Sequence, residues 1–80
     1  MKKITVRYFS QIGPDPGTRA TAYETSAATV RELLHEIQRT RALPLTTNIS
    51  KGAVNGAFVD WEHPVADGDT VTLLPPFSGG

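Results

Sequence analysis

The chain has 80 residues, its eight Lys and Arg side chains are balanced by eight Asp and Glu side chains, and it contains no cysteine. A chain of this length forms one small domain, and its neutral net charge gives no overall field that favours nucleic acid or an anionic membrane. The absence of cysteine excludes disulfides, thiolate metal sites and a cysteine nucleophile.

The N-terminal segment predicts a first strand. Residues 3–9 alternate between an apolar face and a mixed face, which is typical of a half-buried strand. The apolar face is Ile4, Val6 and Tyr8, and the other is Thr5, Arg7 and Phe9. The basic residues at positions 2 and 3 are followed by no long apolar run, so we expect no signal peptide or membrane span and a cytoplasmic protein.

A turn, a second strand and a helix are predicted next. Glycines and prolines at 13–17 indicate a turn, and residues 19–24 can return as an antiparallel strand. Thr29 and Glu32 have the spacing of a capping box, which predicts a helix that ends near Thr40. Apolar residues follow at helical spacing: Val30, Leu33, Leu34 and Ile37. We expect four polar side chains to face solvent: Arg31, Glu32, Glu36 and Gln38.

Residues 41–50 are predicted to be an irregular loop, and short strands follow it. Asn55-Gly56 is a strong two-residue turn signal between strands at 51–55 and 57–59. Asp67-Gly68-Asp69 predicts a turn before a final strand at 70–74. The order of elements predicts one helix packed on a mixed sheet, which is an α+β fold of the ubiquitin-like β-grasp type. Its first and last strands would lie parallel at the sheet centre, within a domain of residues 1–74 followed by an extended tail at 75–80.

The domain offers little that could perform chemistry. His35 and His63 lack the spacing of metal ligands, and turn chemistry explains Asp67 and Asp69 better than a metal or acid–base site does. We therefore expect no metal site, and a self-contained enzyme is the least favoured class.

The tail is different. Pro75 and Pro76 fix φ and prevent further strand pairing, so they project the tail from the last strand. Six residues span at most about 20 Å, and Phe77 is a candidate hydrophobic anchor within them. The carboxylate of Gly80 is an anion at neutral pH, and the glycine pair leaves it unhindered. Such an anion can attack the α-phosphate of ATP. The alternative to a reactive tail is a frayed terminus with two incidental glycines.

The chain resembles the small, sulfur-carrying subunit of molybdopterin synthase, the MoaD-like proteins of the MoaD/ThiS ubiquitin-like superfamily. The resemblance covers most of the chain outside the loops near 13–18 and 40–51. It rests on residues 4–11, 29–34, 53–64, 67–69 and 74–80. The proline pair before the last aromatic residue favours this subunit over the thiamine-pathway carrier.

The resemblance implies a role as sulfur carrier in molybdenum cofactor biosynthesis. A ubiquitin-activating-type adenylyltransferase would use ATP to convert the Gly80 carboxylate to an acyl adenylate, and a sulfur donor would then leave a thiocarboxylate. The large subunit of the synthase, in a heterotetramer with this chain, would supply the catalytic groups that pass sulfur to a pyranopterin precursor. The chain itself would be non-catalytic and would bind no cofactor, no nucleic acid and no membrane.

The resemblance also implies partner contacts. Phe9, Phe58 and Leu74 would form an apolar docking surface beside the tail, although Phe58 and Leu74 could instead be core residues. The tail residues that would contact partners are Pro75, Pro76, Phe77, Ser78 and Gly79. Phe77 stands where a Val is more usual in the family, and no contact is carried over to the loop after the helix.

Three alternatives stay open on the residues alone. The chain could carry sulfur for thiamine, cysteine or another product. It could be a protein modifier that is joined to lysines through Gly80. It could also be a β-grasp interaction module with an inert tail.

Overall fold

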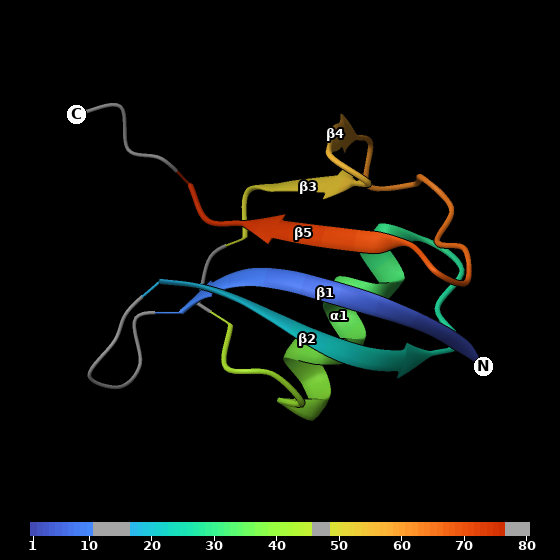
Figure 1. The fold of residues 1–80 in the computed structure, drawn as a ribbon, viewed down its shortest axis with the longest axis horizontal. Helices are drawn as coiled ribbons and strands as arrows, with labels where there is room; N and C mark the ends of the chain where they lie inside the picture. Colours follow the sequence, from blue (N-terminus) through green and yellow to red (C-terminus); the bar gives the residue numbers. More distant parts are fainter. Residues whose placement is uncertain (11–16, 46–48, 77–80) are drawn as a thin grey trace.

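The computed structural model describes residues 1–10, 17–45 and 49–76. Within these ranges the chain forms five strands and one helix (Figure 1). In chain order they are β1 (Lys2–Ser10), β2 (Gly17–Thr25), α1 (Val30–Thr40), β3 (Lys51–Val54), β4 (Ala57–Val59) and β5 (Thr70–Leu74). The strands form one sheet in the order β2-β1-β5-β3-β4, which confirms the predicted α+β, β-grasp arrangement.

The first and last strands lie side by side at the centre of the sheet. β1 and β5 are parallel, with Val6 opposite Val71 and Tyr8 opposite Leu73, whereas the other pairs are antiparallel. All four of these side chains are buried. The alternation read from residues 3–9 is therefore confirmed, and it explains why the central strands bury one face and leave the other open.

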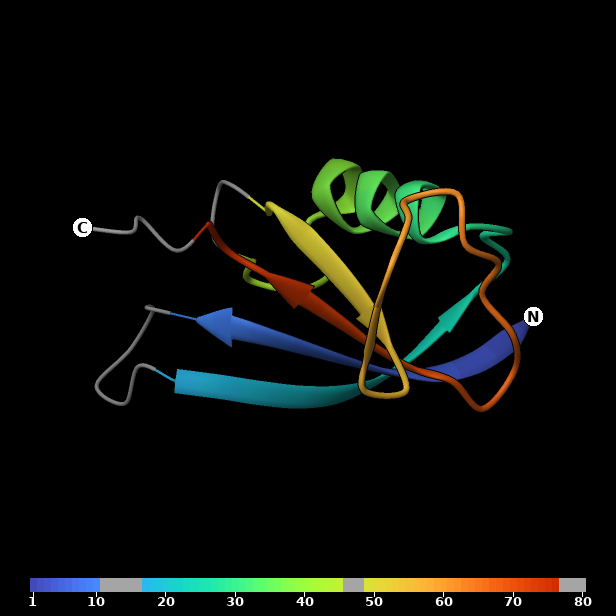
Figure 2. The same cartoon turned by 90° about the horizontal axis from the view of Figure 1, so that it is seen from above.

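Helix α1 covers that buried face (Figure 2). The four apolar residues predicted from helical spacing are buried: Val30, Leu33, Leu34 and Ile37. Full burial of such a side chain stabilises a fold by roughly 1.5–3 kcal/mol, so this stripe holds the helix on the sheet. The opposite face of the sheet carries no helix in the described part of the chain (Figure 2).

Both ends of α1 follow the predicted pattern. The Thr29 hydroxyl accepts a hydrogen bond from the backbone N–H of Glu32 at 3.2 Å. The Glu32 carboxylate accepts from the N–H of Ala28 at 3.5 Å, one residue before the N-cap. At the other end Arg41 adopts a left-handed conformation, and its N–H donates to the Ile37 carbonyl.

One expectation about the helix is wrong. Glu36 does not simply face solvent, because β2 brings two hydroxyls to it. Tyr23 donates to the Glu36 carboxylate at 2.5 Å, and the fully buried Thr25 donates to it at 3.1 Å. Burial, and secondarily the hydrogen bond and negative charge of Glu36, raise the pKa of Tyr23 to about 12. This cluster is a polar link between α1 and the edge strand β2.

The turns behave as the sequence indicates. Asn55 and Gly56 have φ values of 51° and 89°, so they form the predicted two-residue connection of β3 and β4. Asp69 accepts from the side chain of Asn55 and from the N–H of Ala66, and Asp67 accepts from the N–H of Lys3. These aspartates therefore hold turns together, as expected. Residues 13–16 of the predicted first turn lie outside the described residues.

Candidate functional site

The predicted reactive end lies beyond the described part of the chain. Residues 77–80 are outside it, so the expectations for Phe77, Ser78, Gly79 and Gly80 stay predictions. The described part ends with the base of the tail: β5 stops at Leu74, Pro75 is half-buried and Pro76 is exposed. The strand thus ends at the residue before the first proline, where backbone donors for further pairing stop.

The fold determines where the tail leaves the sheet. Because β1 and β5 are parallel, their C-terminal ends lie at the same edge of the sheet (Figure 1). The register continued by one residue places Phe9 beside Leu74. On the other side of β5, Lys51 of β3 pairs with Leu74. The base of the tail is therefore flanked by Phe9 and Lys51.

Side chains from four strands form one surface on the uncovered side of the sheet, which we call the open face. Paired residues share a face, and Val71 and Leu73 point to the core, so Thr72 and Leu74 point to the open face with their partners. The open face consists of Arg7, Phe9, Lys51, Ala53, Phe58, Thr72 and Leu74. It forms two rows across the sheet, one of which is Phe9-Leu74-Lys51 at the base of the tail.

The three apolar residues of the predicted docking surface thus lie on one face. Phe58 is 69% exposed because it points outward from the edge strand β4. Phe9 and Leu74 are half-buried, and neither they nor Phe58 belong to the buried core. The alternative that Phe58 and Leu74 are core residues is wrong. Their contact with a partner stays a prediction.

Two cations belong to the open face. Arg7 and Lys51 are both exposed, and the ammonium group of Lys51 lies 5.3 Å from the centre of the Phe58 ring. Sequence reasoning did not single out either residue. The alternation of 3–9 already set Arg7 beside Phe9, but the position of Lys51 depends on the register of β3.

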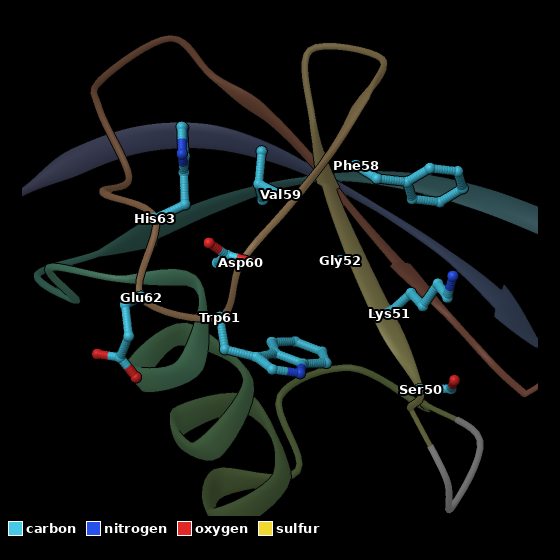
Figure 3. A pocket seen from close by; sticks show the side chains of 9 residues that line it. All are labelled: Ser50, Lys51, Gly52, Phe58, Val59, Asp60, Trp61, Glu62 and His63. Atoms are coloured by element: carbon cyan, nitrogen blue, oxygen red, sulfur yellow. The ribbon is translucent and has the colours of Figure 1, made fainter.

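A depression of about 680 Å³ lies around the β3–β4 edge (Figure 3). Its lining is Ser50, Lys51, Gly52, Phe58, Val59, Asp60, Trp61, Glu62 and His63. The Trp61 ring packs toward Gly52, while Glu62 and His63 point away from Lys51 and Phe58 (Figure 3). Glu62 pairs with Arg31 at 2.5 Å. Ser50 also lies at the opposite end of the depression from Asp60 and His63 (Figure 3), so these side chains do not form a nucleophile, base and orienting group of the kind that catalysis requires.

No cluster of three or more His, Cys, Asp or Glu side chains suited to a metal is present in the ranges that the structure describes. His35 is exposed on α1, and His63 is half-buried in the segment after β4. Over the same ranges, no helix is long and apolar enough to cross a membrane.

Comparison with known proteins gives consistent results. The ThiS family matches residues 6–80. The molybdopterin synthase sulfur carrier subunit of Escherichia coli K12 is 38% identical, over 96% of this chain and 99% of that protein.

Two solved structures are also similar. In a complex of subunits 1 and 2 of the molybdopterin-converting factor from Helicobacter pylori, a chain has a TM-score of 0.62 and 28% identity, covering 98% of this chain and 99% of its own. A putative molybdopterin converting factor subunit 1 from Pyrococcus furiosus has a TM-score of 0.58, covering 96% of this chain and 100% of its own. At 24% identity, this second likeness supports the fold alone.

Proposed function

We propose a function from one premise: the chain belongs to the ThiS family. Within that family, we propose that it is the sulfur-carrier subunit of molybdopterin synthase. The observation that carries this proposal is the 38% identity to a molybdopterin synthase sulfur carrier subunit across nearly the full length of both proteins. The family match continues to residue 80, so it includes the diglycine end.

The chemistry would begin at the Gly80 carboxylate. A C-terminal carboxyl group has a pKa near 3.3–3.7, so it is ionised at neutral pH. One carboxylate oxygen would attack the α-phosphate of ATP held by a ubiquitin-activating-type adenylyltransferase, and pyrophosphate would leave. Sulfide would then attack the carbonyl carbon of the acyl adenylate and release AMP, with the C–S bond replacing the C–O bond to AMP. The product is a thiocarboxylate on Gly80.

The charged tail would next enter the large subunit of the synthase, which would supply the catalytic groups. Support comes from the Helicobacter pylori complex, in which subunits 1 and 2 of a molybdopterin-converting factor are bound together. Two copies of each subunit would form a heterotetramer. ATP belongs to the activating partner, and this chain would act without a bound cofactor, in the cytoplasm.

The open face gives this scheme a docking surface. Phe9, Phe58 and Leu74 would be the apolar contacts, because they lie on one face, where Phe9 and Leu74 border the base of the tail. Pro75 and Pro76 would act as a stiff spacer that directs the tail away from β5. Phe77, Ser78 and Gly79 would line the partner's channel. Since the tail leaves the sheet at one place, both partners would approach the same face in succession.

Reconstitution with defined partners tests the function. The chain is incubated with the adenylyltransferase, ATP and sulfide, and the large subunit and the pyranopterin precursor are then added. We expect dithiolene product from the full-length chain and none after deletion of Gly80. The deletion should leave the unfolding midpoint unchanged, since it lies outside the domain of residues 1–74. Product from the deleted chain would contradict the role of Gly80.

Co-purification from cells separates this function from its alternatives. The tagged chain is expected to retain the large synthase subunit. Retention of a thiazole or cysteine synthase in its place would indicate a carrier for another pathway. Adducts on lysines that survive denaturation would indicate a protein modifier.

A further inference from the structure

The charge on the open face is one-sided, although the chain as a whole is neutral. Arg7 lies opposite Ala20 of β2 on one side and Thr72 of β5 on the other, and Lys51 lies opposite Leu74. Within the described ranges, neither cation makes a salt bridge. The open face therefore has two exposed positive charges and no acidic residue.

The acidic residues of the described ranges lie elsewhere. Glu32 and Glu36 are on α1, Asp60 and Glu62 follow β4, and Asp67 and Asp69 form the turn before β5. Glu24 is the exception that shares this side of the sheet, but it pairs with Lys3 across β1 and β2, at the end of β1 away from Phe9. The local positive charge around Leu74 is therefore not cancelled by its neighbours.

The two cations border the apolar part of the open face. They are two strands apart across the sheet and two residues apart along it, which corresponds to about 12 Å between their Cα atoms. A group that docks midway between them would lie about 6 Å from each, within the screening length of about 8 Å at physiological salt, so both charges would act on it. The ammonium group of Lys51 also lies over the ring of Phe58, the most exposed apolar residue of the open face. A partner that covers Phe58 would therefore also meet the charge of Lys51.

We propose that the open face recognises a surface of the large synthase subunit that is apolar opposite Phe58 and Leu74 and carries carboxylates opposite Arg7 and Lys51. The inference rests on the proposed function for the identity of the partner. The charges supply the complementarity, because an acidic surface would be attracted before contact and would then be held in register by the two cations. The apolar residues supply the contact area.

The same observations disfavour an anionic membrane or nucleic acid as the occupant. Segments that bind anionic lipids have about four to eight clustered basic residues, and nucleic-acid-binding domains have a strongly basic patch. The open face has two cations and the chain has no net charge. A protein surface that combines apolar and acidic groups fits this composition better.

Association kinetics test the proposal. The rate of binding to the purified large subunit is measured at about 50 mM and about 500 mM NaCl for the wild type and for Arg7→Glu/Lys51→Glu. At low salt we expect the double variant to associate roughly tenfold more slowly, and at high salt we expect the two rates to converge. Lys51→Arg keeps the charge and should associate at nearly the wild-type rate. Lys51→Gln should give an intermediate loss.

A matched control tests whether the association rate depends on where the charge is changed or only on how much charge is changed. Arg39→Glu/Arg41→Glu makes the same four-unit change of charge at two exposed positions at the end of α1, on the other side of the sheet. We expect its association rate to stay within about twofold of the wild type at both salt concentrations. Unfolding curves for all variants check that each remains folded.

Several outcomes would overturn the proposal. Equal rates for the wild type and the double variant at low salt would show that the charges play no part, and the proposed function would stand. An equal loss for Arg39→Glu/Arg41→Glu would show that net charge matters rather than the open face. Binding of the wild type to phosphatidylserine vesicles, abolished in the double variant, would assign the cations to a membrane. No binding of the wild-type chain to the large subunit at either salt concentration would contradict both the inference and the proposed function.

Discussion

Replacing Phe58 with alanine should separate folding from partner binding. Full burial of a phenylalanine side chain stabilises a fold by about 1.5–3 kcal/mol. Phe58 is 69% exposed, so less than a third of its surface leaves water on folding, and Phe58→Ala should lower the free energy of unfolding by under about 1 kcal/mol. If a partner covers the remaining surface, Phe58→Ala should weaken binding by about 1–2 kcal/mol, which raises the dissociation constant roughly 5- to 30-fold.

Urea unfolding and titration calorimetry with the large synthase subunit measure the two effects. Leu33→Ala is the matched control, because Leu33 of α1 is fully buried in the core and its truncation should cost about 2–5 kcal/mol of unfolding free energy. The reasoning would be refuted if Phe58→Ala destabilised the fold as much as Leu33→Ala does. Unchanged affinity for the large subunit would refute the docking role of Phe58.

Two further predictions concern the framework that holds the open face. The pKa of Tyr23 is about 12 in the folded state and near 10 in the unfolded chain. The protonated side chain therefore contributes fully to the free energy of unfolding below pH 10, and this contribution is lost as pH rises through 12. Urea unfolding should show that the free energy of unfolding falls by up to about 2 kcal/mol between pH 10 and 12. An equal fall in Tyr23→Phe would contradict the assignment of this pH dependence to Tyr23. In Gly52→Ala the new Cβ would lie 3.0 Å from Val30 Cγ1 and 3.4 Å from Trp61 Cζ3, so thermal unfolding should report about 1–3 kcal/mol of destabilisation. Gly17→Ala meets no atom within 4 Å and should change stability by under about 0.5 kcal/mol; an equal effect of the two substitutions would contradict the packing argument.

The fold was predictable where a local pattern has one physical solution. Alternation at Ile4, Val6 and Tyr8 requires a strand with one buried face, and those residues are buried. The hydroxyl of Thr29 starts α1 as the capping box indicates. Asn55-Gly56 adopts positive φ at both positions, as a two-residue hairpin requires.

Features that depend on contacts between distant segments were less predictable. Glu36 was expected to face solvent, because helical spacing identifies the polar side of a helix without identifying the strand that packs beside it. Tyr23 and Thr25 reach Glu36 across more than ten residues of sequence. For the same reason, the place of Lys51 beside Leu74 follows from the register of β3 on β5, for which no local sequence signal exists.

The central claim is that sulfur is carried on the main chain at Gly80. Intact-mass measurement after incubation with the adenylyltransferase, ATP and sulfide tests it most directly, because the chain has no cysteine that could take up sulfur elsewhere. We expect a mass gain equal to the replacement of one oxygen by sulfur, located by fragmentation to Gly80 and absent when Gly80 is deleted. An unchanged mass, or a gain that persists in the deleted chain, would contradict it.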